Sequence, residues 1–136
     1  MKMSPAELRD LLYRRSGLLG VSGLSGDMRT LLASSKTDAA QAIDLFVFRI
    51  VREIGAMAAS LGGLDGLVFT GGIGENAPVI RERVMAGLRW LGLSLDAKAN
   101  RANALQISAL NSRPSAWVIP TDEEKVIARH TVALLN

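Results

Sequence analysis

A glycine-rich stretch in the middle of the chain has the residue types of a phosphate or nucleotide site. Residues 66–69 (Gly-Leu-Val-Phe) are typical of a short buried strand. The three glycines between Gly71 and Gly74 then allow the backbone to turn sharply and to approach a ligand closely. Asn76 can cap the helix expected next, which has Pro78 in its first turn. A strand, a glycine loop and a helix N-terminus in this order favour anionic ligands.

The spacing of these glycines matches neither of two familiar nucleotide fingerprints. It is not the G-x-G-x-x-G of dinucleotide sites or the G-x-x-x-x-G-K-[ST] of phosphate loops. Glycine loops follow strands in every kind of α/β fold, so a purely structural turn fits the same residues. The residues alone leave both interpretations open.

An acidic turn near the end of the chain has residue types that bind metals. Residues 116–119 predict a second strand, and Thr121 with Glu124 forms a capping box that predicts the last helix. In such a box the Glu124 side chain turns back to the Thr121 N–H. Asp122 and Glu123 are then left to face whatever lies beyond the strand end.

The two turns share one edge of a sheet if strands 66–69 and 116–119 are parallel neighbours, because α/β folds bind ligands at the carboxyl ends of their strands. A phosphate cradle beside carboxylates suits a magnesium nucleotide, since Mg²⁺ takes one or two carboxylates together with waters and phosphate oxygens. Acidic residues are also common at ordinary solvated helix starts. The residues alone favour this simpler interpretation.

Other reactive side chains give weaker signals. His130 is the only histidine, and no serine, cysteine or second histidine lies at a spacing that indicates a triad or a metal site. Arg29, Arg81, Arg83 and Arg101 are each able to meet a phosphate, but we expect them to be exposed surface residues. Only Arg29 is flanked by unusual glycine chemistry.

Composition restricts the class of protein. The chain has 136 residues, 49% of them apolar, and a mean hydropathy of +0.22, which indicates one compact domain. Its net charge of +3 comes without a run of like charges, so a nucleic-acid partner is not expected. The lack of cysteine excludes disulfides and thiolate metal sites. No apolar run approaches the ~20 residues that span a bilayer, and the first residues lack an apolar signal region, so we expect a cytoplasmic protein and no membrane partner.

The elements before the glycine stretch are expected to position it. Ser4 and Glu7 form a capping box that predicts a helix to about Arg15. Residues 16–29 are too apolar for a solvated linker and too glycine-rich for a regular helix, so we expect an ordered loop beside the core. A short helix is expected to start near Asp27, whose carboxylate favours the positive end of a helix.

One long amphipathic helix is predicted to be the largest single source of core stability. Apolar residues recur at three- and four-residue spacing from Ile43 to Leu61, after Thr37 or Asp38 as a cap and before the glycines at 62–63. This pattern predicts a helix of about 24 residues. Each large side chain that it buries contributes roughly 1.5–3 kcal/mol. We assign these positions to the core rather than to a ligand, and excess apolar surface would suit a partner subunit.

Three motifs resemble those of acetate kinases. Residues 15–29 match Lys/Arg-Ser-Gly-Leu-Leu-Gly-x-Ser-Gly-x-Ser-x-Asp-x-Arg, residues 69–76 match Phe-Thr-x-Gly-Ile-Gly-Glu-Asn, and residues 119–124 match Ile-Pro-Thr-x-Glu-Glu. They occur in the right order at compatible spacing, and the similarity covers essentially the whole chain. The chain therefore resembles the C-terminal part of an acetate kinase. Related propionate and butyrate kinases share the pattern.

The resemblance implies a fold and a reaction. The fold is α/β, the C-terminal portion of an actin/sugar-kinase-like (ribonuclease H-like) domain, with short parallel strands, flanking helices and one long helix. Residues 1–136 would form a single partial domain, the nucleotide-side segment of the enzyme. The implied reaction is the reversible ATP-dependent phosphorylation of acetate, or another short carboxylic acid, to an acyl phosphate. The implied cofactors are ATP and Mg²⁺, and the implied assembly is a homodimer joined through the C-terminal domains.

The resemblance also assigns site residues. Two segments would contact the adenine nucleotide, the first consisting of Asp27, Met28 and Arg29 and the second of Gly72, Ile73, Gly74, Glu75 and Asn76. Glu123 would be a magnesium ligand, which agrees with the capping argument above. No residue of this segment is assigned a catalytic role.

The sequence departs from the family pattern in its length. Family chains are much longer, and these 136 residues lack the upstream asparagine, the carboxylate-binding arginines, the catalytic histidine and a phosphate loop of the type His-Leu-Gly-Asn-Gly. Each missing electrostatic stabiliser can cost on the order of 10²–10³ in rate, so we expect no turnover by the chain alone. The alternatives are a non-catalytic module that binds adenine nucleotide or dimerises, and an interaction protein that uses its long helix.

Overall fold

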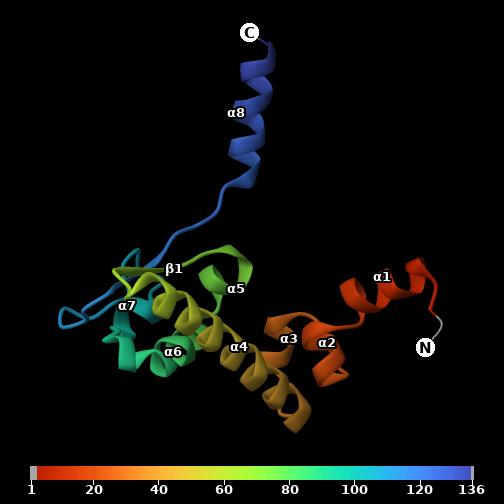
Figure 1. Cartoon of the computed structure of the whole chain (residues 1–136), viewed down its shortest axis with the longest axis horizontal. Coiled ribbons are helices and arrows are strands. Elements are labelled where there is room, and N and C mark those ends of the chain that lie inside the picture. Colours follow the sequence, from red (N-terminus) through yellow and green to blue (C-terminus); the bar gives the residue numbers. More distant parts are fainter. Residues whose placement is uncertain (1–2, 136) are drawn as a thin grey trace.

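A computed structural model describes residues 3–135, except for the side chains of residues 123 and 135 (Figure 1). Helices dominate the described residues, and two short strands lie among them. In chain order the elements are α1 (Pro5–Arg14), α2 (Gly17–Ser22), α3 (Met28–Leu32), α4 (Thr37–Leu61), β1 (Gly66–Phe69), α5 (Gly71–Asn76), α6 (Pro78–Gly87), the 3-10 helix η1 (Arg89–Leu91), α7 (Ala97–Arg101), β2 (Ser115–Val118) and α8 (Glu123–Leu135).

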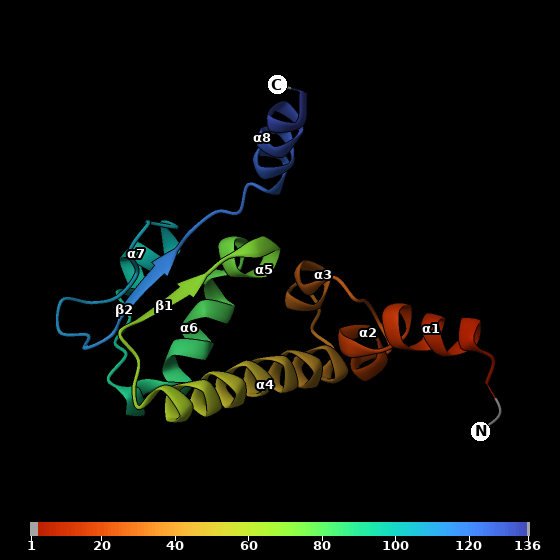
Figure 2. The same ribbon diagram turned by 45° about the horizontal axis from the view of Figure 1, so that its top comes forward.

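Strands β1 and β2 pair in parallel, as the sequence predicted (Figure 2). Gly66 lies opposite Ser115, and Phe69 lies opposite Val118. Just beyond the strands, the Ile119 N–H donates to the Phe69 carbonyl oxygen at 2.9 Å. The segments that follow the two strands therefore leave the sheet at the same edge, which confirms the predicted α/β arrangement with short parallel strands.

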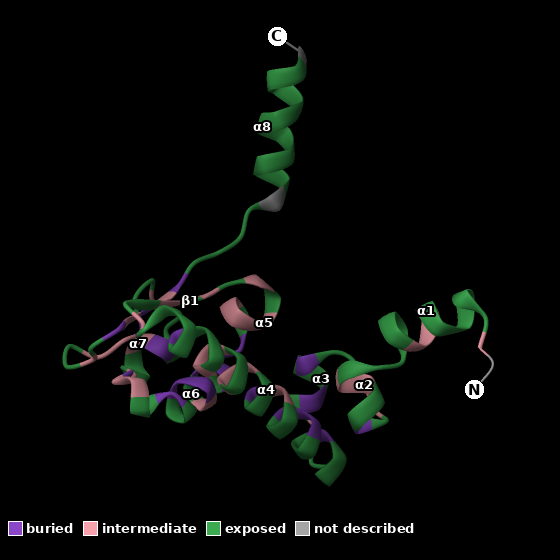
Figure 3. Cartoon of the chain, in the orientation of Figure 1, coloured by how far each residue is buried: buried purple, intermediate pink, exposed green. Residues whose placement is uncertain are grey.

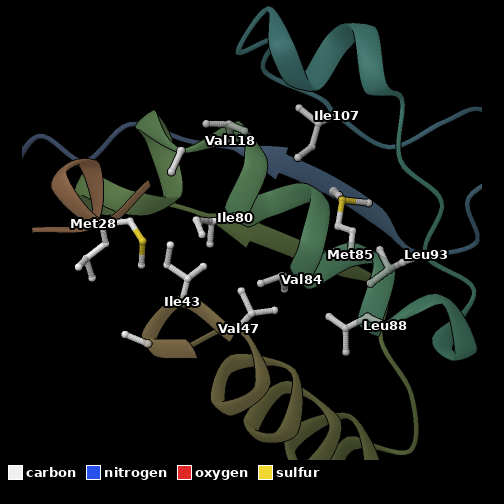
Figure 4. Close-up of a cluster of buried hydrophobic side chains, with 14 of the residues drawn as sticks. Met28, Ile43, Val47, Ile80, Val84, Met85, Leu88, Leu93, Ile107 and Val118 are labelled. Atoms are coloured by element: carbon white, nitrogen blue, oxygen red, sulfur yellow. The ribbon is translucent and has the colours of Figure 1, made fainter. Parts of the chain in front are cut away.

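The hydrophobic core lies where α4, α6 and the sheet meet (Figures 3 and 4). Ile80, Val84 and Leu88 follow one another at four-residue spacing, so they form one buried face along α6 and its C-cap. Ile43 and Val47 of α4 face them, and strand β2 adds buried Val118 on the opposite side (Figure 4). The apolar residues that recur along α6 are thus buried between α4 and the sheet.

The long helix has the predicted extent, but its N-cap is not one of the two predicted residues. Helix α4 covers 25 residues and ends at Gly62, which has a left-handed φ of 75°. Its N-cap is Lys36, without a side-chain cap, so Thr37 is the first helical residue and neither Thr37 nor Asp38 caps the helix. Only part of its apolar stripe is buried, and Phe48 is among the exposed side chains. The helix packs against α2, α3 and α6.

The first part of the glycine- and serine-rich segment after α1 forms the helix α2, which corrects the prediction of a loop there, whereas residues 23–27 are not helical, as predicted. Gly17 and Gly23 both have a φ of 61°, and they lie at the first residue and the C-cap of α2. These glycines therefore mark the ends of the helix instead of preventing it. The expected packing beside the core is confirmed, because α2 lies against α4.

Two local caps agree with the sequence. Ser4 and Glu7 form the predicted capping box at the start of α1. Asp27 is the N-cap of α3 and accepts the Arg29 N–H at 2.9 Å. No helix of the described residues is long and apolar enough to cross a membrane.

The core predicts a contrast between two leucines. Leu88 is fully buried, whereas Leu110 is fully exposed. We expect Leu88→Ala to lower the free energy of unfolding by about 2–5 kcal/mol, because it leaves a cavity between packed elements. Leu110→Ala is the matched control and should change that free energy by less than about 0.5 kcal/mol. Urea unfolding monitored by circular dichroism measures both, and equal effects of the two variants would contradict the assigned core.

Candidate functional site

A pocket of about 340 Å³ brings together two segments that are far apart in the sequence. One is the start of α3 with the residues before it, and the other is α5 with the residue after it; Figure 2 shows these two helices facing each other. The lining residues are Gly26, Asp27, Met28, Arg29, Gly72, Ile73, Asn76 and Ala77. The pocket therefore contains every residue predicted to contact the nucleotide except Gly74 and Glu75.

Asp27 and Arg29 form an ion pair at the rim of this pocket. The Arg29 Nη2 lies 3.0 Å from the Asp27 Oδ2, and its Nε lies 3.3 Å from Oδ1. The Arg29 guanidinium and its backbone N–H hold the pKa of Asp27 below the usual value, and the carboxylate raises the pKa of Arg29. The Arg29 side chain is 87% exposed. Exposed pairs contribute little to stability, so the guanidinium is able to leave Asp27 for another anion at small cost.

The predicted glycine loop is a short helix, α5, held close to β1. Its N-cap is Thr70, and Gly71 has a φ of 70°, which a glycine adopts without strain. A Cβ atom at Gly74 would lie 3.2 Å from the backbone carbonyl carbon of Phe69. A side chain at Gly74 would therefore push α5 away from the strand. This close approach explains the glycine at position 74 without invoking a ligand.

Asn76 does not cap the next helix, which corrects the prediction. It is the last residue of α5, and its Nδ2 donates to the Gly72 carbonyl oxygen at 3.0 Å. The Ala77 N–H still donates to the Ile73 carbonyl oxygen at 3.0 Å, so α5 continues through Asn76. The chain leaves the helical conformation at Ala77, because the residue before Pro78 is disfavoured there.

The carboxylate of Glu75 joins the glycine segment to the acidic turn. Its Oε1 accepts the Gly71 N–H at 2.8 Å, the Thr121 N–H at 2.9 Å and the Thr121 hydroxyl at 3.1 Å. These hydrogen bonds, led by the one from the Thr121 backbone, lower the pKa of Glu75. Glu75 thus fixes the distance between the end of β1 and the end of β2. Glu75 therefore has a linking role, and the nucleotide contact that the family resemblance assigns to it stays a prediction.

The same contact replaces the predicted capping box at the last helix. The Thr121 N–H is already bound to Glu75, so it does not receive the Glu124 side chain. Asp122 caps α8 instead, with its Oδ1 accepting the Lys125 N–H at 2.9 Å. The helix therefore begins one residue later than the box required, and a partner distant in the sequence decides its start.

The predicted magnesium ligand, Glu123, is the first residue of α8, and its side chain lies outside the described residues. Its role stays a prediction. Asp122 and Glu124 on either side are exposed, so the turn at this sheet edge presents carboxylates to solvent. The described residues contain no cluster of three or more possible metal ligands. Mg²⁺ bound together with a nucleotide takes only one or two carboxylates, and the donor chemistry of the turn fits that requirement.

The structure reveals one functional candidate that the sequence analysis expected to be an exposed surface residue. The Arg81 side chain is fully buried, which lowers its pKa, although an arginine stays charged at neutral pH. Its Nη1 donates to the carbonyl oxygens of Gly74 and Glu75, at 2.8 Å each. The available signal was its spacing, because buried Val84 and Met85 follow Arg81 by three and four residues and so lie on the same face of α6.

A family model described as the acetokinase family matches residues 1–129. The chain belongs to the acetokinase family. An acetate kinase of Methylocella silvestris is 60% identical over 135 residues, which cover 99% of this chain and 33% of the relative. An acetate kinase of Rhodopseudomonas palustris is 62% identical over 136 residues, which cover 98% of this chain and 34% of the relative.

Solved structures of an acetate kinase and a propionate kinase share the fold. The crystal structure of the Porphyromonas gingivalis acetate kinase has a TM-score of 0.86 and 37% identity, and the match covers 98% of this chain and 35% of that one. A Francisella tularensis propionate kinase has a TM-score of 0.84 and 37% identity, over 93% of this chain and 33% of that one. The chain thus spans about a third of the length of these acetokinase-family proteins.

The Glu75 contacts predict a local pH dependence in this acetokinase-family chain. The folded pKa of Glu75 lies below its ordinary 4.5, so the contact stabilises the fold fully above that pH and is lost as pH falls through the lower folded value. NMR should show the Gly71 and Thr121 amide protons titrating together with a midpoint below 4.5. Glu75→Gln should abolish that shared titration. A midpoint at or above the ordinary value would contradict the geometry.

Proposed function

We propose that this chain supplies adenosine and magnesium contacts to a kinase that phosphorylates acetate to acetyl phosphate with ATP. The supporting observation is the pocket that joins the start of α3 to α5, because both segments carry family motifs. The similar proteins named acetate kinase support the choice of reaction. The sequence itself holds none of the expected catalytic groups, so the proposed role is binding and orientation.

The residues of the pocket suit the parts of a nucleotide. Ile73 offers an apolar side chain for a base, Met28 lines the pocket from the core with only 3% of its surface exposed, and Gly72 leaves open space in which a ring can approach the backbone. The Arg29 guanidinium is a planar fork that matches a phosphate, and its exposed pair with Asp27 is easily exchanged. Each element of the pocket thus has a complementary part in an adenine nucleotide.

Glu123 is the proposed magnesium ligand, with the exposed carboxylates beside it as further candidates. Bound Mg²⁺ would neutralise charge on the phosphate oxygens. What this chain itself contributes is the position of the turn. The Glu75 carboxylate holds Thr121, two residues before Glu123, at a fixed place beside α5.

The acceptor acid and the oligomeric state are also part of the proposal. A propionate kinase matches with nearly the same TM-score as an acetate kinase, so propionate is the alternative acceptor. We also propose a homodimer in the cytoplasm. Large apolar side chains stay exposed on several helices, among them Leu12 of α1, Phe48 of α4 and Ile127 of α8, and a second chain would cover some of them.

Isothermal calorimetry with MgATP and MgADP tests the binding role. We expect the chain to bind, and we expect Gly72→Leu to weaken binding at least roughly tenfold, because the new side chain enters open space at the pocket. Ala56→Leu adds the same side chain at an exposed position of α4 away from the pocket and should leave affinity unchanged. Absence of heat with the unaltered, folded chain would refute the binding role.

A further inference from the structure

Arg81 makes an unusual set of contacts for a buried charge. Its side chain is 0% exposed, and all three guanidinium nitrogens donate hydrogen bonds. None of the ion pairs among the described residues involves Arg81. The charge is therefore balanced by neutral oxygens, and each of these oxygens belongs to α5, to α7 or to Asn103, two residues after the end of α7.

Helix α5 lacks the donors that would normally satisfy its last carbonyl groups. In a continuing helix the Gly74 carbonyl oxygen accepts the N–H of residue 78, but that residue is Pro78 and has no N–H. The Arg81 Nη1 takes this place, at 2.8 Å from the Gly74 oxygen and 2.8 Å from the Glu75 oxygen. A proline thus breaks the helix, and an arginine three residues later satisfies the carbonyls that the break leaves open.

The other two nitrogens anchor Arg81 to the α7 region. Nε donates to the Asn100 Oδ1 at 2.7 Å, and Nη2 donates to the Asn100 carbonyl oxygen at 2.8 Å and to the Asn103 Oδ1 at 2.6 Å. The Asn100 Nδ2 returns a hydrogen bond to the Pro78 carbonyl oxygen at 2.9 Å. Asn103 has a φ of 49°, the one left-handed non-glycine residue among those described. The asparagine is held in this uncommon conformation while its side chain meets the guanidinium.

We infer that Arg81 is a positioning residue for the nucleotide pocket, acting through α5 on Gly72 and Ile73. It does not line the pocket itself, and it fixes the helix that does. The part of the inference that concerns nucleotide binding rests on the proposed function. Its structural part, that Arg81 orders α5 from the α7 region, stands separately.

Only an arginine fits this position. Five acceptor contacts converge on one planar group, from two backbone carbonyls of α5, from the Asn100 backbone and side chain, and from Asn103. A lysine offers three donors from a single nitrogen, so it cannot span the α5 carbonyls and both asparagines. Arg81→Lys keeps the charge and removes the fork, which makes it the sharpest variant.

Hydrogen exchange measured by mass spectrometry tests the structural part without nucleotide. In Arg81→Lys we expect the amides of residues 71–77 to exchange at least about tenfold faster, because charge-assisted hydrogen bonds are lost, while residues 43–54 of α4 keep their rate. Arg83→Lys is the matched control on the same helix, since Arg83 is partly exposed and pairs with Asp44. It should leave both rates unchanged. An equal increase in α5 and α4, or no increase in α5, would overturn the inference.

If Arg81→Lys does not fold, Asn103→Gly tests whether the contacts of Arg81 order α5. Glycine suits the positive φ and removes only the Asn103 Oδ1 contact, so exchange in α5 should rise about threefold with α4 unchanged. Unchanged exchange in α5 would overturn the inference.

Calorimetry with MgADP then separates the effect of Arg81 on nucleotide binding from its effect on the order of α5. If the unaltered chain binds, the variant with faster exchange in α5 should bind at least roughly tenfold more weakly, and equal affinity would refute the effect on the pocket. If the unaltered chain does not bind, the proposed function fails, and the exchange rates still decide whether Arg81 orders α5.

Discussion

The parallel pairing of β1 with β2 determines where the pocket helix and the acidic turn lie relative to each other. Parallel strands leave a sheet at the same edge, so the segments after Phe69 and Val118 emerge side by side. That proximity allows one carboxylate, on Glu75, to bind the backbone of both segments. The pocket at α5 and the acidic turn before α8 are consequently parts of one unit.

Helix α5 shows how a weak element is made rigid by its neighbours. Six residues, three of them glycine, have little helical stability of their own. Glu75 satisfies the first N–H of the segment, Arg81 satisfies carbonyls near its end, and Gly74 lets it lie against Phe69. The helix is therefore ordered by hydrogen bonds and packing from residues outside it.

The extent of the long helix and the parallel pairing of the strands were predicted correctly, whereas several helix caps and the side-chain partners of Glu75 and Arg81 were not. The Asp27 cap and the extent of α4 follow from patterns a few residues long, and both are confirmed. The Thr121 capping box failed because Glu75, 46 positions away, takes the same N–H. Arg81 was expected at the surface, since an arginine is rarely buried and its acceptors Asn100 and Asn103 lie 19 and 22 positions away.

The motifs and the apolar periodicity of neighbouring residues were sufficient to predict the family, strands 66–69 and 116–119, the long helix and the two segments that line the pocket. The links that Glu75 makes between two turns, and the hydrogen bonds of Arg81 to α5, became visible only in the folded chain. The physical reason is that hydrogen-bonding groups are not specific to one partner. Which donor meets which acceptor depends on distances that exist only after the chain has folded.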